Sequence, residues 1–225
     1  MIRAVATDVD GTLTNYNDEL YLEAISAIRA LERKGIKVIL CTGNALCVTK
    51  ALARYIGCTG PTVSENGAVV EYKAKIRVIG RKNVGREALD ELKKIFHEEI
   101  VESWSNAYRF VDIAIRRTIP FNEVDKIVKK VNGAKVLDSG FAYHITDESV
   151  DKGKGLLLAL DLIGVRAEEV LGVGDSITDL EMLKVCGIRA AVANADLRIK
   201  EIADIVAEKE FGLGFAEIVN KIVKL

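Results

Sequence analysis

The sequence of 225 residues contains no glutamine, two histidines and four cysteines. The cysteines form no Cys-x-x-Cys pair and no histidine cluster accompanies them, which argues against a zinc site and against a disulfide framework. We therefore expect buried free thiols. The absence of glutamine beside abundant lysine and glutamate is a bias reported for proteins of hot environments.

Long apolar runs and an excess of positive charge are also missing. No stretch approaches the roughly 18 apolar residues that a membrane span needs, and the first residues lead directly into a strand, which leaves no room for a signal peptide. The formal net charge is −1 and the Lys and Arg pairs are scattered, so a basic nucleic-acid-binding face is not expected. These absences predict a cytoplasmic protein whose partner is neither a membrane nor a nucleic acid.

Two acids stand at the end of the first apolar segment, in the run Ala-Thr-Asp-Val-Asp-Gly-Thr-Leu-Thr of residues 6–14. The two-residue period of a strand aims the carboxylates of Asp8 and Asp10 toward one region, and Gly11 permits a sharp turn. Acids this close repel each other unless a cation neutralises them, and oxygen ligands favour Mg²⁺. The alternative is a plain solvated turn, because Asp, Gly and Thr are ordinary turn residues.

The Asp-x-Asp-Gly-Thr pattern resembles the first motif of the haloacid dehalogenase-like (HAD) hydrolases. The second motif of that family, a Ser or Thr after the second core strand, is matched by Thr42, which follows the apolar run 36–41. Thr42, Gly43 and Asn44 precede a predicted helix, where hydroxyl and backbone N–H groups can bind phosphate oxygens. The same residues would also serve as an ordinary helix cap.

The third motif, a Lys near a helix start, is matched by Lys152 in the run Asp-Lys-Gly-Lys-Gly. Its ammonium group could neutralise carboxylate and phosphoryl oxygens. Lys154, two residues further on, is a rival for this role, and a plain surface lysine is the simpler alternative for either.

The fourth motif, Gly-Asp-x-x-x-Asp, is matched at full spacing by residues 174–179, directly after the apolar run 170–173. Asp175 and Asp179 are four positions apart, so one helical turn brings both carboxylates to the same side. An acid at a helix start also complements the helix dipole, but that needs only one acid, and two are present.

The hydrophobic pattern between the second and third motifs differs from the rest. Helices alternate with strands in the order α-β-α-β-β, and the strands have one apolar face each. We predict an α/β fold in which a Rossmann-like parallel-sheet core, residues 1–80 and 151–225, carries a small inserted α+β cap domain, residues 81–150. The elements expected in the cap are helices at 84–96 and 124–131, a strand at 110–116, and a hairpin of 134–137 with 141–145.

The resemblance to HAD hydrolases implies phosphoryl transfer through an aspartyl-phosphate. Asp8 would be the nucleophile and Asp10 the general acid and base, an acid that phosphatases need and dehalogenases do not. Other roles follow the motifs: Mg²⁺ would be held by Asp8, the backbone carbonyl of Asp10, Asp175 and Asp179, and substrate would be bound by Thr42, Gly43, Asn44 and Lys152.

The cap position resembles the C2-capped, Cof-like branch of the family. The compact cap, the Glu-Asn-Gly turn at 65–67 and the Asp-Lys-Gly run are most similar to archaeal phosphoglycolate phosphatases. The implied partner is a small phosphorylated metabolite, 2-phosphoglycolate, and a homodimer is left open. A sugar-phosphate phosphatase or phosphomutase and a non-enzymatic receiver-like module are the alternatives. For His144, in a predicted cap strand, we favour packing over substrate contact.

Overall fold

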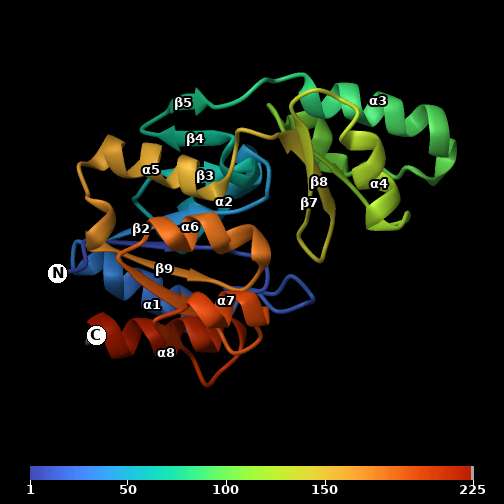
Figure 1. The fold of residues 1–225 in the computed structure, drawn as a ribbon. Coiled ribbons are helices and arrows are strands. Elements are labelled where there is room, and N and C mark those ends of the chain that lie inside the picture. The colour runs from blue at the N-terminus through green and yellow to red at the C-terminus, as the bar shows by residue number, and fades with distance from the viewer. Residues whose placement is uncertain (224–225) are drawn as a thin grey trace.

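The computed structural model describes residues 1–223 and contains one large sheet of eight strands (Figure 1). Its order is β11-β10-β9-β1-β2-β3-β4-β5. All neighbours from β11 to β3 are parallel, and β4 and β5 add an antiparallel edge. The strands are β1 (Ala4–Thr7), β2 (Lys37–Cys41), β3 (Thr62–Ser64), β4 (Val69–Tyr72), β5 (Lys75–Val78), β9 (Val170–Gly174), β10 (Ile188–Ala191) and β11 (Ile205–Val206).

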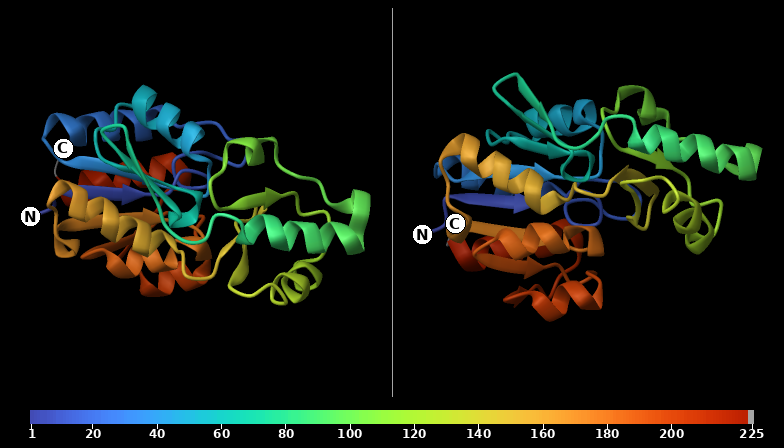
Figure 2. Two further views of the ribbon diagram at one scale, coloured as in Figure 1. Left: turned by 90° about the horizontal axis from the view of Figure 1, so that it is seen from above. Right: turned by 45° about the horizontal axis from the view of Figure 1, so that its top comes forward.

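Helices cover both faces of this sheet, so the central strands are buried on both sides and are almost entirely apolar. Helices α5 and α6 pack against each other on one face, and α1 and α8 do so on the other (Figure 2). The core helices are α1 (Leu22–Arg33), α2 (Leu46–Ile56), α5 (Lys152–Ile163), α6 (Leu180–Val185), α7 (Leu197–Ile202) and α8 (Phe211–Val223).

The cap is a second, antiparallel sheet with the order β6-β8-β7 and its own apolar cluster. It lies at the end of the core that is remote from both chain termini (Figure 1). The predicted α-β-α-β-β order and the predicted fold class are confirmed. The cap elements are α3 (Val84–Phe96), β6 (Ile113–Ile115), α4 (Phe121–Val128), β7 (Ala134–Asp138) and β8 (Tyr143–Asp147).

Two expectations for the cap are wrong. The strand expected at 110–116 begins only at Ile113, because the backbone N–H groups of 110–112 donate to the side chain of Glu65 instead of to a neighbouring strand. The helix expected at 124–131 is shifted to Phe121–Val128, directly after Pro120. The expectation of one apolar face on each strand is confirmed: alternate residues such as Tyr143 and Ile145 lie in the apolar cluster of the cap, although all five residues of β8 are buried. One face of the cap sheet packs on the cap helices, while the other contributes residues to the cavity between cap and core.

Smaller features complete the fold. Among the described residues no helix is long and apolar enough to cross a membrane. All four cysteines are free; Cys41 and Cys186 are buried as expected, but Cys47 is exposed on α2. The sequence pattern also predicts an amphipathic helix at 213–225. It is present as α8 up to Val223, and the positions 224 and 225 lie outside the described residues.

Candidate active site

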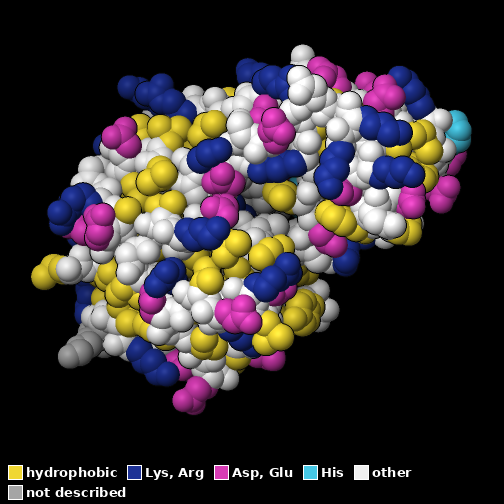
Figure 3. Space-filling model, in the orientation of Figure 1, with side chains coloured by type: hydrophobic (Ala, Val, Ile, Leu, Met, Phe, Trp, Pro, Cys, Tyr) yellow, Lys and Arg dark blue, Asp and Glu magenta, His cyan; other side chains and the backbone are white. Residues whose placement is uncertain are grey.

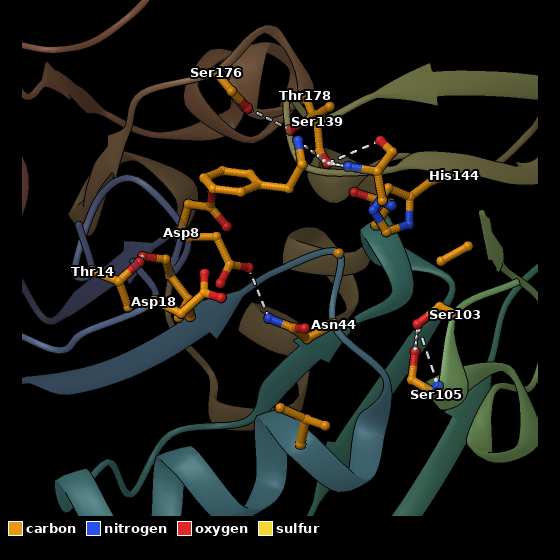
Figure 4. A pocket seen from close by; sticks show the side chains of 18 of the residues that line it. Asp8, Thr14, Asp18, Asn44, Ser103, Ser105, Ser139, His144, Ser176 and Thr178 are labelled. Carbon is orange, nitrogen blue, oxygen red and sulfur yellow. Dashed lines mark hydrogen bonds between the residues drawn. The ribbon is translucent and has the colours of Figure 1, made fainter. Parts of the chain in front are cut away.

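A cavity of about 520 Å³ lies between the carboxyl ends of the central strands and the cap. In a parallel α/β sheet ligands bind at this edge, because the loops after neighbouring strands meet there. Asp8 and Asn44 of the core face His144 and Ser139 of the cap across it (Figure 4). Ser176 and Thr178, which are more than 160 positions after Asp8 in the sequence, line the same cavity.

Lys152 connects the first, third and fourth motifs. Its Nζ donates to Asp8 Oδ1 at 2.9 Å and to Asp179 Oδ1 at 2.7 Å, and all three side chains are buried. Burial lowers the pKa of Lys152, but the carboxylates of Asp179 and Asp8 outweigh that effect and raise it, so the ammonium remains charged. The ammonium group of Lys152 therefore places a positive charge at the cavity, next to Asp8.

Asp10 is held by the second motif. Its Oδ2 accepts from Asn44 Nδ2 at 2.8 Å and from Thr42 Oγ1 at 3.3 Å. Thr42 Oγ1 in turn accepts from the backbone N–H of Asn44 at 3.1 Å. This contact forms a Ser/Thr turn ahead of the helix. The helix α2 begins after Ala45, which makes no side-chain cap hydrogen bond, so the expected helix cap is wrong and the turn after β2 serves to orient an acid.

Asp175 is fixed by the turn after β1. Thr12 Oγ1 donates to Asp175 Oδ1 at 2.7 Å. Gly11 has a φ of +85°, and a Cβ atom at that position would lie 2.5 Å from Asp175 Oδ2. Glycine is thus required both by the backbone conformation and by the close approach of the carboxylate.

Asp179 organises the loop that carries Asp175. Its Oδ2 accepts from the backbone N–H groups of Asp175 and Ser176 at 3.1 and 3.0 Å, while Oδ1 accepts from Lys152. The predicted helical turn is present as a short 3₁₀ helix, Ile177–Asp179. Both oxygens of this carboxylate therefore have hydrogen-bond donors within the protein.

The four acids carry more negative charge than Lys152 can balance. Burial, followed by the charge of Asp179, raises the pKa of Asp175 to about 7. Burial is also the largest cause of the raised pKa values of Asp8 and Asp10. A carboxylate cluster whose charged form is disfavoured in this way is stabilised by a bound cation.

The residues present fit a hard divalent cation. Asp8, Asp175 and Asp179 offer carboxylate oxygens that lie within 4.8 Å of one another. The donor set contains oxygen atoms alone, which favours Mg²⁺ over softer metals. Because Asp179 already accepts three hydrogen bonds within 3.1 Å, Asp8 and Asp175 are the acids with the most free ligand capacity.

Comparison with known proteins agrees with this arrangement. A family model described as haloacid dehalogenase-like hydrolase matches residues 5–114 and 120–218. The chain belongs to this family. The predicted family is therefore confirmed, and so is the predicted enzyme class, a phosphoric monoester hydrolase.

Relatives of this HAD-like hydrolase match over nearly the whole chain. It is 39% identical to a phosphoglycolate phosphatase of Methanothermobacter thermautotrophicus, over 98% of each chain. It is 41% identical to a phosphoglycolate phosphatase of Staphylothermus marinus, over 99% of this chain and 98% of the relative. A crystal structure from Thermoplasma acidophilum superposes with a TM-score of 0.91 at 28% identity, covering all of both chains.

The HAD-like core brings together every side chain predicted for the site. Asp8, Lys152 and Asp179 are in direct contact, and Thr12 ties Asp175 to the same turn. Of the two lysines considered for the third motif, Lys152 is the one that contacts the acids. The Lys154 side chain is half exposed and contacts Asp151 and the backbone of Ser149, away from the acids.

The cap face of the site was largely missed by sequence reasoning. Arg109, Asp112 and His144 form a buried cluster beside the cavity, and Arg109 Nη1 donates to the carbonyl of Gly43 at 3.0 Å. His144, for which packing was expected, lines the cavity. One signal was available: Asp112 is a lone acid between Val111 and Ile113 in an otherwise apolar segment.

Thr12 and Asn194 were also missed as parts of the site. Asn194 Nδ2 donates to the carbonyl of Gly11 at 2.8 Å, and its Oδ1 accepts from the backbone N–H of Phe211. It thereby couples the first turn to the start of α8. Thr12 belongs to the first motif, but its role became visible only from its contact with Asp175.

Proposed function

We propose that this protein is a Mg²⁺-dependent phosphatase that hydrolyses a small phosphate monoester, 2-phosphoglycolate, to glycolate and phosphate. The observation that carries the proposal is the contact of Lys152 with Asp8 at the cavity, beside Asp10 and Thr42. Nucleophile, ammonium group and second acid thus line one cavity, and the hydroxyl of Thr42 contacts the second acid. The phosphoglycolate phosphatases among the relatives support the choice of substrate.

In the first step a carboxylate oxygen of Asp8 attacks phosphorus, and the bond from phosphorus to the substrate's ester oxygen breaks. Asp10, oriented by Asn44 and Thr42, donates a proton to the leaving alkoxide. Lys152 and the donors of the turn after β2 bind the phosphoryl oxygens, where charge is greatest in the transition state.

In the second step water cleaves the aspartyl-phosphate. Asp10, now deprotonated, accepts a proton from the attacking water, and Asp8 is released as a carboxylate. Asp8, Asp175 and the carbonyl of Asp10 would hold Mg²⁺, with Asp179 next to them. When bound, the ion reduces the repulsion between the anionic nucleophile and the anionic phosphoryl group.

The second candidate is a sugar-phosphate phosphatase or phosphomutase. The observation behind this alternative is the volume of the cavity, about 520 Å³, which has room for a hexose phosphate as well as for 2-phosphoglycolate. A receiver-like module has less support, because the match to the hydrolase family extends from residue 5 to residue 218. Release of inorganic phosphate separates a phosphatase from a mutase.

A panel of phosphorylated metabolites, assayed for phosphate release with Mg²⁺, tests the proposal. We expect 2-phosphoglycolate to have the highest kcat/KM. Turnover of a hexose phosphate far above that of 2-phosphoglycolate would contradict the proposed substrate while leaving a phosphatase. No phosphate release from any monoester would contradict the function as a whole.

Asp8→Asn tests the mechanism. Removal of the nucleophilic oxygen is expected to lower kcat by about 10⁴-fold or more, since the covalent step has no substitute. A phosphoenzyme trapped from wild type by acid quench should be absent from the variant. Thermal unfolding serves as the control for folding, and a variant that folds and retains turnover would contradict the assignment of Asp8.

A further inference from the structure

The side chains of Arg109, Asp112 and His144 form a buried cluster on the cap side of the cavity. Asp112 Oδ1 accepts from Arg109 Nη1 at 2.8 Å and from His144 Nδ1 at 3.0 Å. Asp112 Oδ2 accepts from Asn66 Nδ2 of the core at 2.9 Å. Asp112 is completely buried, so these contacts hold Arg109 and His144 side by side in a fixed orientation.

Arg109 is bound on two of its three guanidinium nitrogens. Nε donates to Ser105 Oγ at 3.1 Å, and Nη1 donates to Asp112 and to the carbonyl of Gly43. Nη2 donates to no group within residues 1–223. The side chain is only 3% exposed and yet lines the cavity, so a pair of N–H donors remains for a ligand.

The contact with Gly43 places Arg109 next to the proposed phosphate-binding turn. Gly43 follows Thr42, whose hydroxyl contacts Asp10. A Cβ atom on Gly43 would lie 3.2 Å from the His144 ring, so cap and core approach each other closely here. Asp8, Arg109 and His144 line the same cavity, so a short ligand attached to a phosphate at Asp8 shares this space with the cap cluster.

We propose that Arg109, oriented by Asp112, binds the carboxylate of the substrate and selects phosphate esters that carry a carboxylate on a short chain. Charge-assisted hydrogen bonds from a guanidinium to a carboxylate are strong and directional. A preorganised buried donor pair also rejects substrates that leave it without an acceptor. This inference rests on the proposed function and deepens it by naming the residue that distinguishes the substrate class.

The test compares 2-phosphoglycolate with ethyl phosphate, which lacks the carboxylate. In Arg109→Gln, kcat/KM for 2-phosphoglycolate should fall roughly 10- to 100-fold, the usual loss of a charge-assisted hydrogen bond, mainly through KM. The value for ethyl phosphate should change less than about threefold, because ethyl phosphate has no group for Arg109 to bind. Arg109→Lys should recover part of the preference, since it keeps the charge.

Arg117→Gln is the matched control, because Arg117 is a cap arginine that pairs with Asp138 on the surface, outside the cavity lining. It should leave both substrates unaffected. A binding measurement complements the kinetics: phosphonoacetate should raise the unfolding temperature of wild type more than ethylphosphonate does, and this difference should vanish in Arg109→Gln.

The outcomes separate the two proposals. An equal loss with both substrates in Arg109→Gln would mean that Arg109 only holds the cap in place, and would overturn the inference. Equal wild-type turnover of both substrates would overturn it too. A wild-type enzyme that hydrolyses hexose phosphates but not 2-phosphoglycolate would reject the proposed substrate itself, and the inference with it.

Discussion

Gly11 has two tasks at the first motif: its backbone takes a φ of +85°, and its missing side chain leaves space for Asp175. The left-handed region costs a residue with a Cβ about 1–2 kcal/mol. A Cβ atom on residue 11 would also displace the Asp175 carboxylate, which is a separate effect. A carboxylate moved by about 1 Å can no longer hold the same cation or face the same nucleophile.

Gly11→Ala should therefore lose activity far more than stability. We expect kcat/KM to fall by about 100-fold and the free energy of unfolding by about 1–2 kcal/mol. Gly35→Ala is the matched control, since Gly35 has a φ of +78° and no atom within 4 Å of its added Cβ. The control should show the same stability loss with normal kinetics. Equal activity in both variants would contradict the role assigned to Gly11.

At the scale of the element, the two chain segments that join cap and core are tied together by Asp147 at the end of β8. This buried carboxylate accepts from the backbone N–H of Arg81 on the outgoing segment at 2.9 Å. On the returning segment it accepts from the N–H and hydroxyl of Ser149 at 2.8 and 2.6 Å. Burial opposes these donors, but together they lower the pKa of Asp147 to about 2.

The sign of the resulting pH dependence follows from this lowered pKa. An aspartate with a pKa of about 3.9 when unfolded and a lower one when folded stabilises the protein above pH ~4, and this stabilisation is lost as the pH falls toward 2. Asp147→Asn should cost roughly 1–3 kcal/mol at neutral pH. Unfolding by urea should show that the difference in the free energy of unfolding between wild type and Asp147→Asn becomes smaller as the pH falls from 5 to 2.

Asp138→Asn is the control for that experiment, because Asp138 is a less buried acid on the adjacent strand β7 that pairs with Arg117. Its effect on stability should be much smaller, as is usual for surface ion pairs. If the difference in the free energy of unfolding between Asp147→Asn and wild type stayed constant down to pH 2, the charge of the carboxylate would not stabilise the connection between cap and core.

For the whole molecule, the buried acid cluster links stability to the cation. The pKa of Asp175, raised to about 7 by burial and by Asp179, means that the metal-free fold holds a proton that the unfolded chain releases from about pH 4 upward. Stability without metal should therefore fall as the pH rises from 4 to 7. A cation that binds only the folded state reverses this loss.

Asp175→Asn should consequently show opposite effects with and without Mg²⁺. In EDTA at pH 8 we expect the variant to unfold at the same temperature as wild type or a higher one. With Mg²⁺ at about 100 times its Kd, wild type should gain about 2.7 kcal/mol, a rise of roughly 5–10 °C, and the variant little. An equal Mg²⁺ shift in both proteins would place the ion elsewhere.

The molecular surface is consistent with the charge composition. On the face seen in Figure 3, Lys and Arg side chains alternate with Asp and Glu over both core and cap. The strong electrostatic feature lies at the cavity, where the buried ammonium group of Lys152 pairs with the buried carboxylates of Asp8 and Asp179. Small-molecule chemistry at that cavity is therefore better supported than binding along an extended surface.

Much of the fold was predictable because its signals are local. Apolar runs such as 36–41 and 170–173 indicated strands covered on both faces, and the turn residues after them indicated where each strand ended. The motif residues Asp8, Thr42 and Asp175 could be placed at one edge of the sheet because each follows a parallel strand and such strands end together. Their roles in catalysis stay predictions.

The sequence by itself determined the strand and helix order, the family and the acids that converge on the first motif, since all of these follow from periodicity and motif spacing along the chain. Only the tertiary structure decided that Glu65 replaces a strand partner for 110–112, that Lys152 rather than Lys154 reaches Asp8, and that Arg109 lines the cavity. The physical reason is that these contacts join segments whose encounter depends on how the cap packs on the core and how one helix start is oriented. Neither of these is encoded in the spacing of neighbouring residues.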